Sequence, residues 1–301
     1  MKHLHNEVLK TLLYYDIWHY PLTARELFAF LPVNSISLLE FNKRLREMVV
    51  GRYILEHDDY YFVRGKSRSV VSQRVAKAHH ARKLWRMARI SMHIIKRFPF
   101  VRAVFVSGEL SKNATNHMSD VDFFIVTAPN RLWITRSLLI MFKKLFLLNK
   151  KKYFCLNYFA TSDHLQLDDQ NIFLASEIAH LKPLYNSALF FEYMIANMWI
   201  ITYFPNFDLQ YAVLPKVSER RSILQKITEA AFSLLPADKL DDYLLKTMEK
   251  IWAKRYPEYD DVTREKIFRS TKTESRAYVG NCEAKVLALY EQKLREFGIR
   301  Q

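Results

Sequence analysis

The sequence of 301 residues is 50% hydrophobic and 14% aromatic, which supplies a sizeable core and excludes an intrinsically disordered chain. Its 46 Lys and Arg against 31 Asp and Glu give a formal net charge of +15, which favours anionic partners such as nucleic acid, nucleotides or a membrane surface. The two cysteines, Cys155 and Cys282, argue against a disulfide framework or a thiolate metal site. No signal peptide is recognisable at the start, so we expect a cytoplasmic protein. The length suits about two domains.

Residues 1–66 carry the pattern of three helices followed by a hairpin. Residues 7–18 have helical spacing, and Thr23 and Ser37 each stand three positions before a glutamate, which is the capping-box signature of a helix start. Two short strand-like runs around an acidic turn complete the unit. This order is similar to a winged helix, so we expect a small winged-helix-like domain that folds on its own.

In a winged helix, the third helix enters the major groove of DNA. The residues that the third helix offers here for such a contact are Asn42, Lys43, Arg44 and Arg46. Two glutamates on the same helix weaken the DNA interpretation. The alternative is a packing or protein-binding module whose charges are merely solvated.

Residues 67–98 are expected to form one long basic helix that connects this domain to the next. The stretch from 60 to 108 contains twelve Lys or Arg and neither Asp nor Glu, and residues 69–97 have helical spacing without glycine or proline. Because such a run repels itself, contact with phosphate or nucleic acid competes with the simpler account of a solvated helix face.

The stretch 101–128 contains the residues best suited to chemistry. Apolar runs at 103–106 and 121–126 predict two short buried strands. Side chains alternate along a strand, so Asp120 and Asp122 are expected on one face, about 7 Å apart at their Cα atoms. Two carboxylates so placed are costly unless a cation neutralises them, and Mg²⁺ takes oxygen ligands of this kind.

This pattern resembles the polymerase-beta-like nucleotidyltransferase superfamily: an apolar strand that ends in glycine, a spacer, and then Asp-apolar-Asp, with Gly108 twelve residues before Asp120. The resemblance covers about residues 98–165. It implies transfer of a nucleoside monophosphate from a nucleoside triphosphate to a hydroxyl acceptor, with Mg²⁺ or Mn²⁺ held by the catalytic Asp120 and Asp122. The residues that it implies for nucleotide binding are Ser107, Gly108, Ser111, Lys112 and Ser119.

Two positions depart from the superfamily pattern. Glu109 follows the glycine where Ser or Gly is usual, and a carboxylate beside phosphates is repulsive, so we expect Glu109 to be held away from them. The third carboxylate of the superfamily is replaced by Asn157, on a strand expected at 153–160; it is a possible metal ligand but cannot act as a base. Other carboxylates follow on a predicted loop, namely Asp163, Asp168 and Asp169.

Two other functions therefore stay open. One is a catalytically weak or inactive nucleotide-binding regulator that acts through a DNA-binding winged helix. The other is a DNA-binding protein whose central part is only a dimerisation platform.

The rest of the chain is predicted to be helical, over residues 130–148, 172–181, 188–204, 218–256 and 261–297. Residues 188–204 are expected to form a buried core helix and not a membrane span, because polar residues interrupt them. The predicted fold class is α+β. Its parts are a winged-helix-like domain (1–66), the basic connecting helix (67–98), a nucleotidyltransferase core with a small mixed sheet (99–186) and a helical C-terminal region (187–301).

Overall fold

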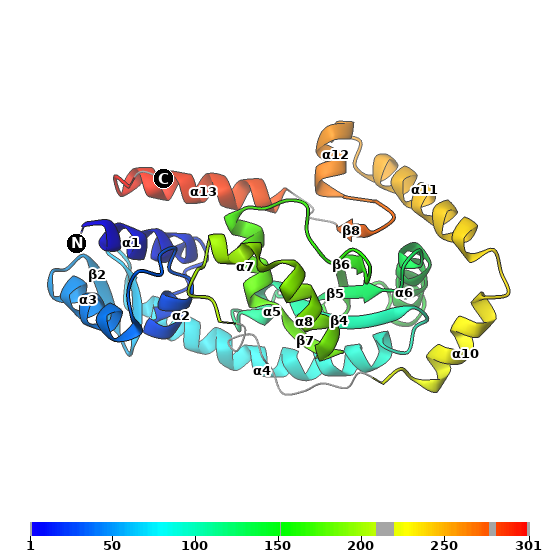
Figure 1. Cartoon of the computed structure of the whole chain (residues 1–301), viewed down its shortest axis with the longest axis horizontal. Helices are drawn as coiled ribbons and strands as arrows, with labels where there is room; N and C mark the ends of the chain where they lie inside the picture. The colour runs from blue at the N-terminus through cyan, green and yellow to red at the C-terminus, as the bar shows by residue number, and fades with distance from the viewer. Residues whose placement is uncertain (1, 151, 209–219, 277–280, 300–301) are drawn as a thin grey trace.

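The computed structural model describes residues 2–150, 152–208, 220–276 and 281–299, and it has the α+β character expected from the sequence (Figure 1). A three-stranded sheet lies in the N-terminal part and a five-stranded sheet lies in the middle of the molecule. Within these ranges, no helix combines the length and the apolar character needed to cross a membrane.

The N-terminal unit has the predicted order of helices and strands, with one additional short strand. Its elements are α1 (Lys2–Asp16), β1 (Leu22–Thr23), α2 (Ala24–Ala29), α3 (Leu38–Val50), β2 (Ile54–His57) and β3 (Tyr60–Val63). The strands form an antiparallel sheet of order β1-β3-β2. Both predicted helix starts are confirmed, since Thr23 and Glu26 form a reciprocal capping box and Ser37 Oγ accepts from the Glu40 N–H at 3.2 Å.

Helix α4 (Ser69–Ile95) confirms the predicted long helix and runs beneath both the N-terminal unit and the central sheet in Figure 1. Near its start, the buried Arg74 donates to the Pro21 carbonyl at 2.8 Å and to Glu26 at 2.6 Å. Near its end, Ser91 Oγ donates to the Tyr153 carbonyl at 2.7 Å. The helix therefore fixes the N-terminal unit against the central sheet.

The central sheet has the strand order β7-β4-β5-β6-β8. Its strands are β4 (Val101–Ser107), β5 (Asp122–Thr127), β6 (Cys155–Thr161), β7 (Lys182–Tyr185) and β8 (Glu274–Arg276). The three strands predicted from the apolar runs are confirmed as β4, β5 and β6, whereas β7 and β8 were not predicted. β4 and β5 are antiparallel, with the one-turn helix α5 (Gly108–Ser111) at the start of their connection, and β5 and β6 are parallel, joined through α6 (Leu132–Phe146).

The remaining elements are α7 (Ile172–His180), α8 (Ser187–Ala196), the 3-10 helix η1 (Met198–Thr202), α10 (Ile223–Phe232), α11 (Ala237–Arg255), α12 (Asp261–Ile267) and α13 (Cys282–Glu296). Two predicted helices are wrong in their extent. The expected helix 188–204 is interrupted at the buried Asn197, whose side chain accepts from the Leu167 N–H at 2.9 Å and donates to the Leu165 carbonyl at 2.8 Å. The expected helix 261–297 is interrupted by β8, and the start expected at residue 218 lies outside the described residues.

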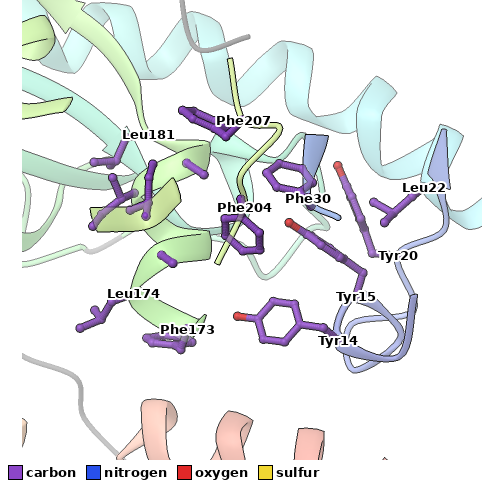
Figure 2. Close-up of a cluster of buried hydrophobic side chains, with 14 of the residues drawn as sticks. Tyr14, Tyr15, Tyr20, Leu22, Phe30, Phe173, Leu174, Leu181, Phe204 and Phe207 are labelled. Carbon is purple, nitrogen blue, oxygen red and sulfur yellow. The ribbon is translucent and has the colours of Figure 1, made fainter. Parts of the chain in front are cut away.

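One hydrophobic core joins the N-terminal unit to the C-terminal helices. Figure 2 shows Tyr14, Tyr15 and Phe30 directed toward Phe173 and Phe204 in this cluster. Phe30 lies at the centre, with ring centroids 5.4 Å from Tyr15 and 5.3 Å from Phe204. Because the N-terminal unit shares its core with α7, η1 and α13, the expectation that it folds alone is revised: its burial depends on the rest of the chain.

We expect Phe30→Ala to lower the free energy of unfolding of the whole chain by about 3–5 kcal/mol, because it opens a cavity at a side chain that is 1% exposed. Denaturant unfolding should remain one transition. The matched control is Leu39→Ala on α3, which is 80% exposed and should change the free energy of unfolding by less than about 0.5 kcal/mol. Separate unfolding of the N-terminal unit in Phe30→Ala would contradict the shared core.

Candidate functional site

A cavity of about 310 Å³ lies where the N-terminal unit, the edge of the central sheet, α7 and α13 meet. Four of the predicted site residues line it, namely Gly108, Lys112, Asp122 and Asn157. A larger cavity of about 430 Å³, between α11 and α12, contains no predicted site residue. We therefore take the first cavity as the candidate site, because the chemistry of its walls outweighs its smaller size.

Gly108 and Asp122 are in contact at the end of β4 and the start of β5, where Ser107 and Asp122 are paired in the ladder. The backbone of Gly108 has a φ of +67°, a left-handed conformation that side chains disfavour. A Cβ atom at this position would lie 2.5 Å from Asp122 Oδ2, so it would displace the carboxylate. Only glycine accommodates both the turn and the carboxylate here.

Asp122 is held in a surrounding that disfavours its charged form. Burial is the main cause, and it raises the pKa of Asp122 from 3.8 to about 6. A hydrogen bond from the Cys155 side chain acts in the opposite direction on this pKa. The negative charges of Asp120, Glu177 and Glu109 raise the pKa further. The site therefore concentrates negative charge that a bound cation would relieve.

Asp120 lies beside this site but outside the strand. β5 begins at Asp122, so the expected placement of both aspartates on one strand face is revised. Asp120 is half-buried and near enough to influence the pKa of Asp122. Within the described ranges, no three His, Cys, Asp or Glu side chains are arranged to hold a metal ion by themselves.

Glu109 also lines the cavity, and the expectation that it is held away from the phosphates stays a prediction. Its carboxylate accepts a hydrogen bond from Ser119 Oγ, and Ser119 Oγ accepts one from the Asn116 N–H at 2.8 Å. Ser119 therefore orients Glu109, and its hydroxyl is already occupied by the protein.

Lys112 directly follows the one-turn helix α5 that begins at the glycine turn. Its ammonium pairs with Glu177 on α7 and lies 5.6 Å from the ring centroid of Trp18. Its backbone carbonyl accepts a hydrogen bond from Tyr20 Oη at 2.6 Å. Lys112 thus connects the turn after β4 to both α7 and the N-terminal unit.

The two remaining serines predicted to bind nucleotide are buried. Ser111 Oγ donates to the Gly108 carbonyl at 2.8 Å, which closes the one-turn helix α5. Ser107 Oγ has no hydrogen-bond partner among the described residues and faces a small cavity of about 40 Å³ that Asn157 and Glu177 also line. Among the serines predicted to bind nucleotide, Ser107 is thus the one whose hydroxyl no described group occupies, but it does not line the larger cavity.

Asn157 lies on β6 at an irregularity of its pairing with β5 and lines the same cavity as Asp122. Of the three aspartates that follow β6, two are bound elsewhere. Asp168 pairs with Arg269, and Asp169 pairs with Arg276 at 2.6 Å. These two ion pairs make both aspartates poor candidates for a missing third carboxylate.

Several residues of the cavity were not predicted. Glu177 had a sequence signal, because it is the one acidic residue in the otherwise apolar helix α7. Trp18 and Lys77 had none, since they reach the cavity only through the packing of the N-terminal unit and α4 on the central sheet. Lys77 Nζ donates to the Trp18 carbonyl at 3.4 Å, so these two residues form one wall.

We expect Asp122→Asn to stabilise the metal-free protein at pH 7.5 by at most about 3 kcal/mol, the free energy that corresponds to a pKa raised from 3.8 to about 6. Because the pKa of the folded state is raised, the charged Asp122 destabilises the wild type above pH 6. This penalty disappears as the pH falls through 6 toward 4, and the advantage of the variant should disappear with it. Denaturant unfolding of both proteins across this range measures the difference.

The control for this comparison is Asp163→Asn, at an exposed position, which should leave the stability difference from wild type near zero at both ends of the range. Loss of stability in Asp122→Asn at pH 7.5 would show that the carboxylate is structural.

Comparison of the chain with protein-family models, with curated proteins and with solved structures finds no match. What the site can do therefore follows from its own residues and their geometry.

Proposed function

We propose that the chain is a nucleotidyltransferase-like protein that binds a nucleoside triphosphate with a divalent cation and transfers the nucleoside monophosphate to a hydroxyl acceptor. The observation that carries this function is the contact of Gly108 with Asp122 at the wall of a cavity large enough for a ligand. In support, β4 and β5 are antiparallel and β6 is parallel to β5, which brings Asn157 to the cavity from the third strand.

The phosphates of the nucleotide would approach the backbone of Gly108 beside the carboxylate of Asp122, with the cation between the carboxylate and the phosphate oxygens. Lys112 and Lys77 line the same cavity and supply positive charge. Ser107 lies behind this turn, and its buried hydroxyl has no partner among the described residues. A nucleoside triphosphate as ligand is consistent with the cytoplasmic location that we expect from the sequence.

The donor set fits Mg²⁺ or Mn²⁺ when the nucleotide contributes oxygens. Mg²⁺ is usually held by one or two carboxylates together with substrate phosphates, which suits Asp122 with Asp120 and the carbonyl oxygen of Asn157. A bound cation would favour the charged form of Asp122 and would so oppose the burial that raises its pKa. When bound, the cation would neutralise charge that develops on the transferred phosphoryl group.

Proton removal from the acceptor has no assigned base, because Asn157 cannot accept a proton in that role. General-base assistance contributes typically about 10²–10⁴-fold, so its absence slows transfer without abolishing it. Glu109 and Glu177 are the other carboxylates that line the cavity.

A second candidate function is a nucleotide-binding regulator that contacts nucleic acid. It is favoured by a row of exposed cations on α4, formed by Arg82, Arg86 and Arg89. These positions recur at helical spacing on one face, and none of the three forms an ion pair within the described part of the chain. The element order of the N-terminal unit also agrees with a winged helix.

On α3, by contrast, Arg44 pairs with Glu40 at 2.8 Å and with Glu47 at 3.0 Å. Its charge is thus partly neutralised within the helix. The arginine row of α4 is therefore the stronger candidate for phosphate contact.

The test of transferase function is incubation of the full chain with each labelled nucleoside triphosphate and Mg²⁺ or Mn²⁺. We expect pyrophosphate release with one of them, and loss of metal-dependent nucleotide binding in Asp122→Asn, because the variant removes the charge that holds the cation. Asp163 is exposed and is not among the residues that line the cavity, so Asp163→Asn should behave as wild type. Metal-dependent binding without pyrophosphate release would favour the regulator, and failure of all triphosphates to bind would exclude both functions.

For nucleic acid, we expect the variant Arg86→Gln with Arg89→Gln to reduce the slope of log affinity against log salt by about 1.4–1.8, since each phosphate contact contributes about 0.7–0.9. Binding of single-stranded and duplex DNA across a salt series measures the slope. Lys43→Gln with Arg46→Gln on α3 is the matched variant. A greater loss in the α3 variant would make α3, and not α4, the contacting helix.

A further inference from the structure

The C-terminal end of α6 and the turn after it expose large apolar side chains that the proposed function does not use. Met141 is 52% exposed, Leu145 66%, Phe146 70% and Leu148 77%. We call these four residues the α6 tip. Isolated exposed apolar residues are ordinary, but four such neighbours on one short stretch mark an interaction surface.

The α6 tip packs on a cluster of aromatic residues. The partly buried Phe142 contacts Phe98, with ring centroids 5.5 Å apart, and the buried Phe154, at 5.8 Å. Leu148 and Asn149 adopt φ angles of 48° and 57°, so the chain turns back immediately after the exposed leucine. A cavity of about 270 Å³ adjoins the tip, lined by Phe146, Leu147, Leu148, Lys150, Tyr153 and Phe154.

Basic side chains surround this apolar surface. Lys144, Lys150 and Lys152 are exposed. Lys144 and Lys150 form no ion pair within the described ranges, and Lys152 Nζ donates to the His117 carbonyl at 2.9 Å. No acidic residue occurs in the sequence between Asp122 and Asp163, so the chain segment that forms the tip carries only positive charge.

We propose that the α6 tip docks on the surface of an anionic lipid bilayer. Phe146 and Leu148 would enter the boundary between headgroups and acyl chains, while the surrounding lysines stay among the anionic headgroups. The charge favours this occupant over a second copy of the chain: a two-fold contact through the tip would place lysines against lysines. Exposed side chains that project from a helix end suit a bilayer, which needs no complementary shape.

The tip lies at the same edge of the central sheet as the candidate site. α6 connects the parallel strands β5 and β6, so its C-terminal end returns to the edge where both strands begin. The Val121 N–H donates to the Lys152 carbonyl at 2.9 Å, which ties the turn after α6 to the approach to Asp122. Docking through the tip would therefore hold this edge near the bilayer surface. The membrane contact does not depend on nucleotide transfer.

The test is sedimentation of the full chain with phosphatidylcholine vesicles, with and without phosphatidylglycerol. We expect binding only to the anionic vesicles, weakening as salt rises. Phe146→Ser with Leu148→Ser, and separately Lys144→Gln with Lys150→Gln, should each weaken binding at least about tenfold. The matched control is Leu39→Ser with Val262→Ser, at positions 80% and 79% exposed on other helices, which should bind as wild type.

Three results would overturn the bilayer contact. They are absence of binding to anionic vesicles, equal loss in the control, and full binding by the Phe146 and Leu148 variant. If the Phe146 and Leu148 variant binds fully, loss of binding in Arg86→Gln with Arg89→Gln would assign the contact to α4.

A fourth result that would overturn the bilayer contact comes from analytical ultracentrifugation in the absence of lipid. A wild-type dimer that the tip variants dissociate would identify the tip as an interface between copies.

Discussion

The continuous core between the N-terminal unit and the C-terminal helices is the constraint on which the rest of the structure depends. Tyr15 and Phe30 pack against α7 and η1, and this packing places Trp18 and Tyr20 at the mouth of the cavity. Without it, the cavity would lose one wall and the turn after β4 would lose its contact with the N-terminal unit. A unit that reads as a separate domain in the sequence is thus part of the candidate site.

The carboxylates around Asp122 repel one another, and the backbone conformation at Gly108 allows Asp122 to lie among them. Asp122 could lie away from Asp120, Glu109 and Glu177 if its position were free, but the absence of a side chain at Gly108 lets the carboxylate settle against the strand end. Proteins retain such unfavourable groups mostly where ligands compensate them. Structural ion-pair networks also perturb pKa values, yet Asp122 forms no ion pair in the described ranges.

Local features of the sequence were sufficient to predict much of the fold. The structure retains three kinds of short-range signal. They are the capping box at Thr23 and the side-chain cap at Ser37, the uninterrupted helical spacing of α4, and the apolar runs of β4 to β6. The failures have long-range causes. β8 has three residues and exists because it pairs with β6, and the break at Asn197 exists because its side chain hydrogen-bonds the backbone of residues 165–167.

The residues of the candidate site also fall into those that a local pattern predicts and those that depend on long-range packing. Gly108, Asp122 and Asn157 were predicted because each occupies a position of the resembled motif, at the end of an apolar strand or within one. Trp18, Lys77 and Glu177 come from elements whose contact with the sheet no local pattern encodes. The sequence also could not indicate that the hydroxyls of Ser111 and Ser119 form hydrogen bonds within the protein, with the Gly108 carbonyl and with Glu109.

One hydrogen bond has a thermodynamic consequence for the whole molecule. Tyr20 Oη donates to the Lys112 carbonyl at 2.6 Å, so the N-terminal unit is attached to the turn that lines the cavity. If the N-terminal unit binds a partner, a cavity ligand that favours one geometry of this turn would change the affinity for that partner by some factor. Linkage requires the partner to change the affinity for the cavity ligand by the same factor, so binding at either surface would alter binding at the other.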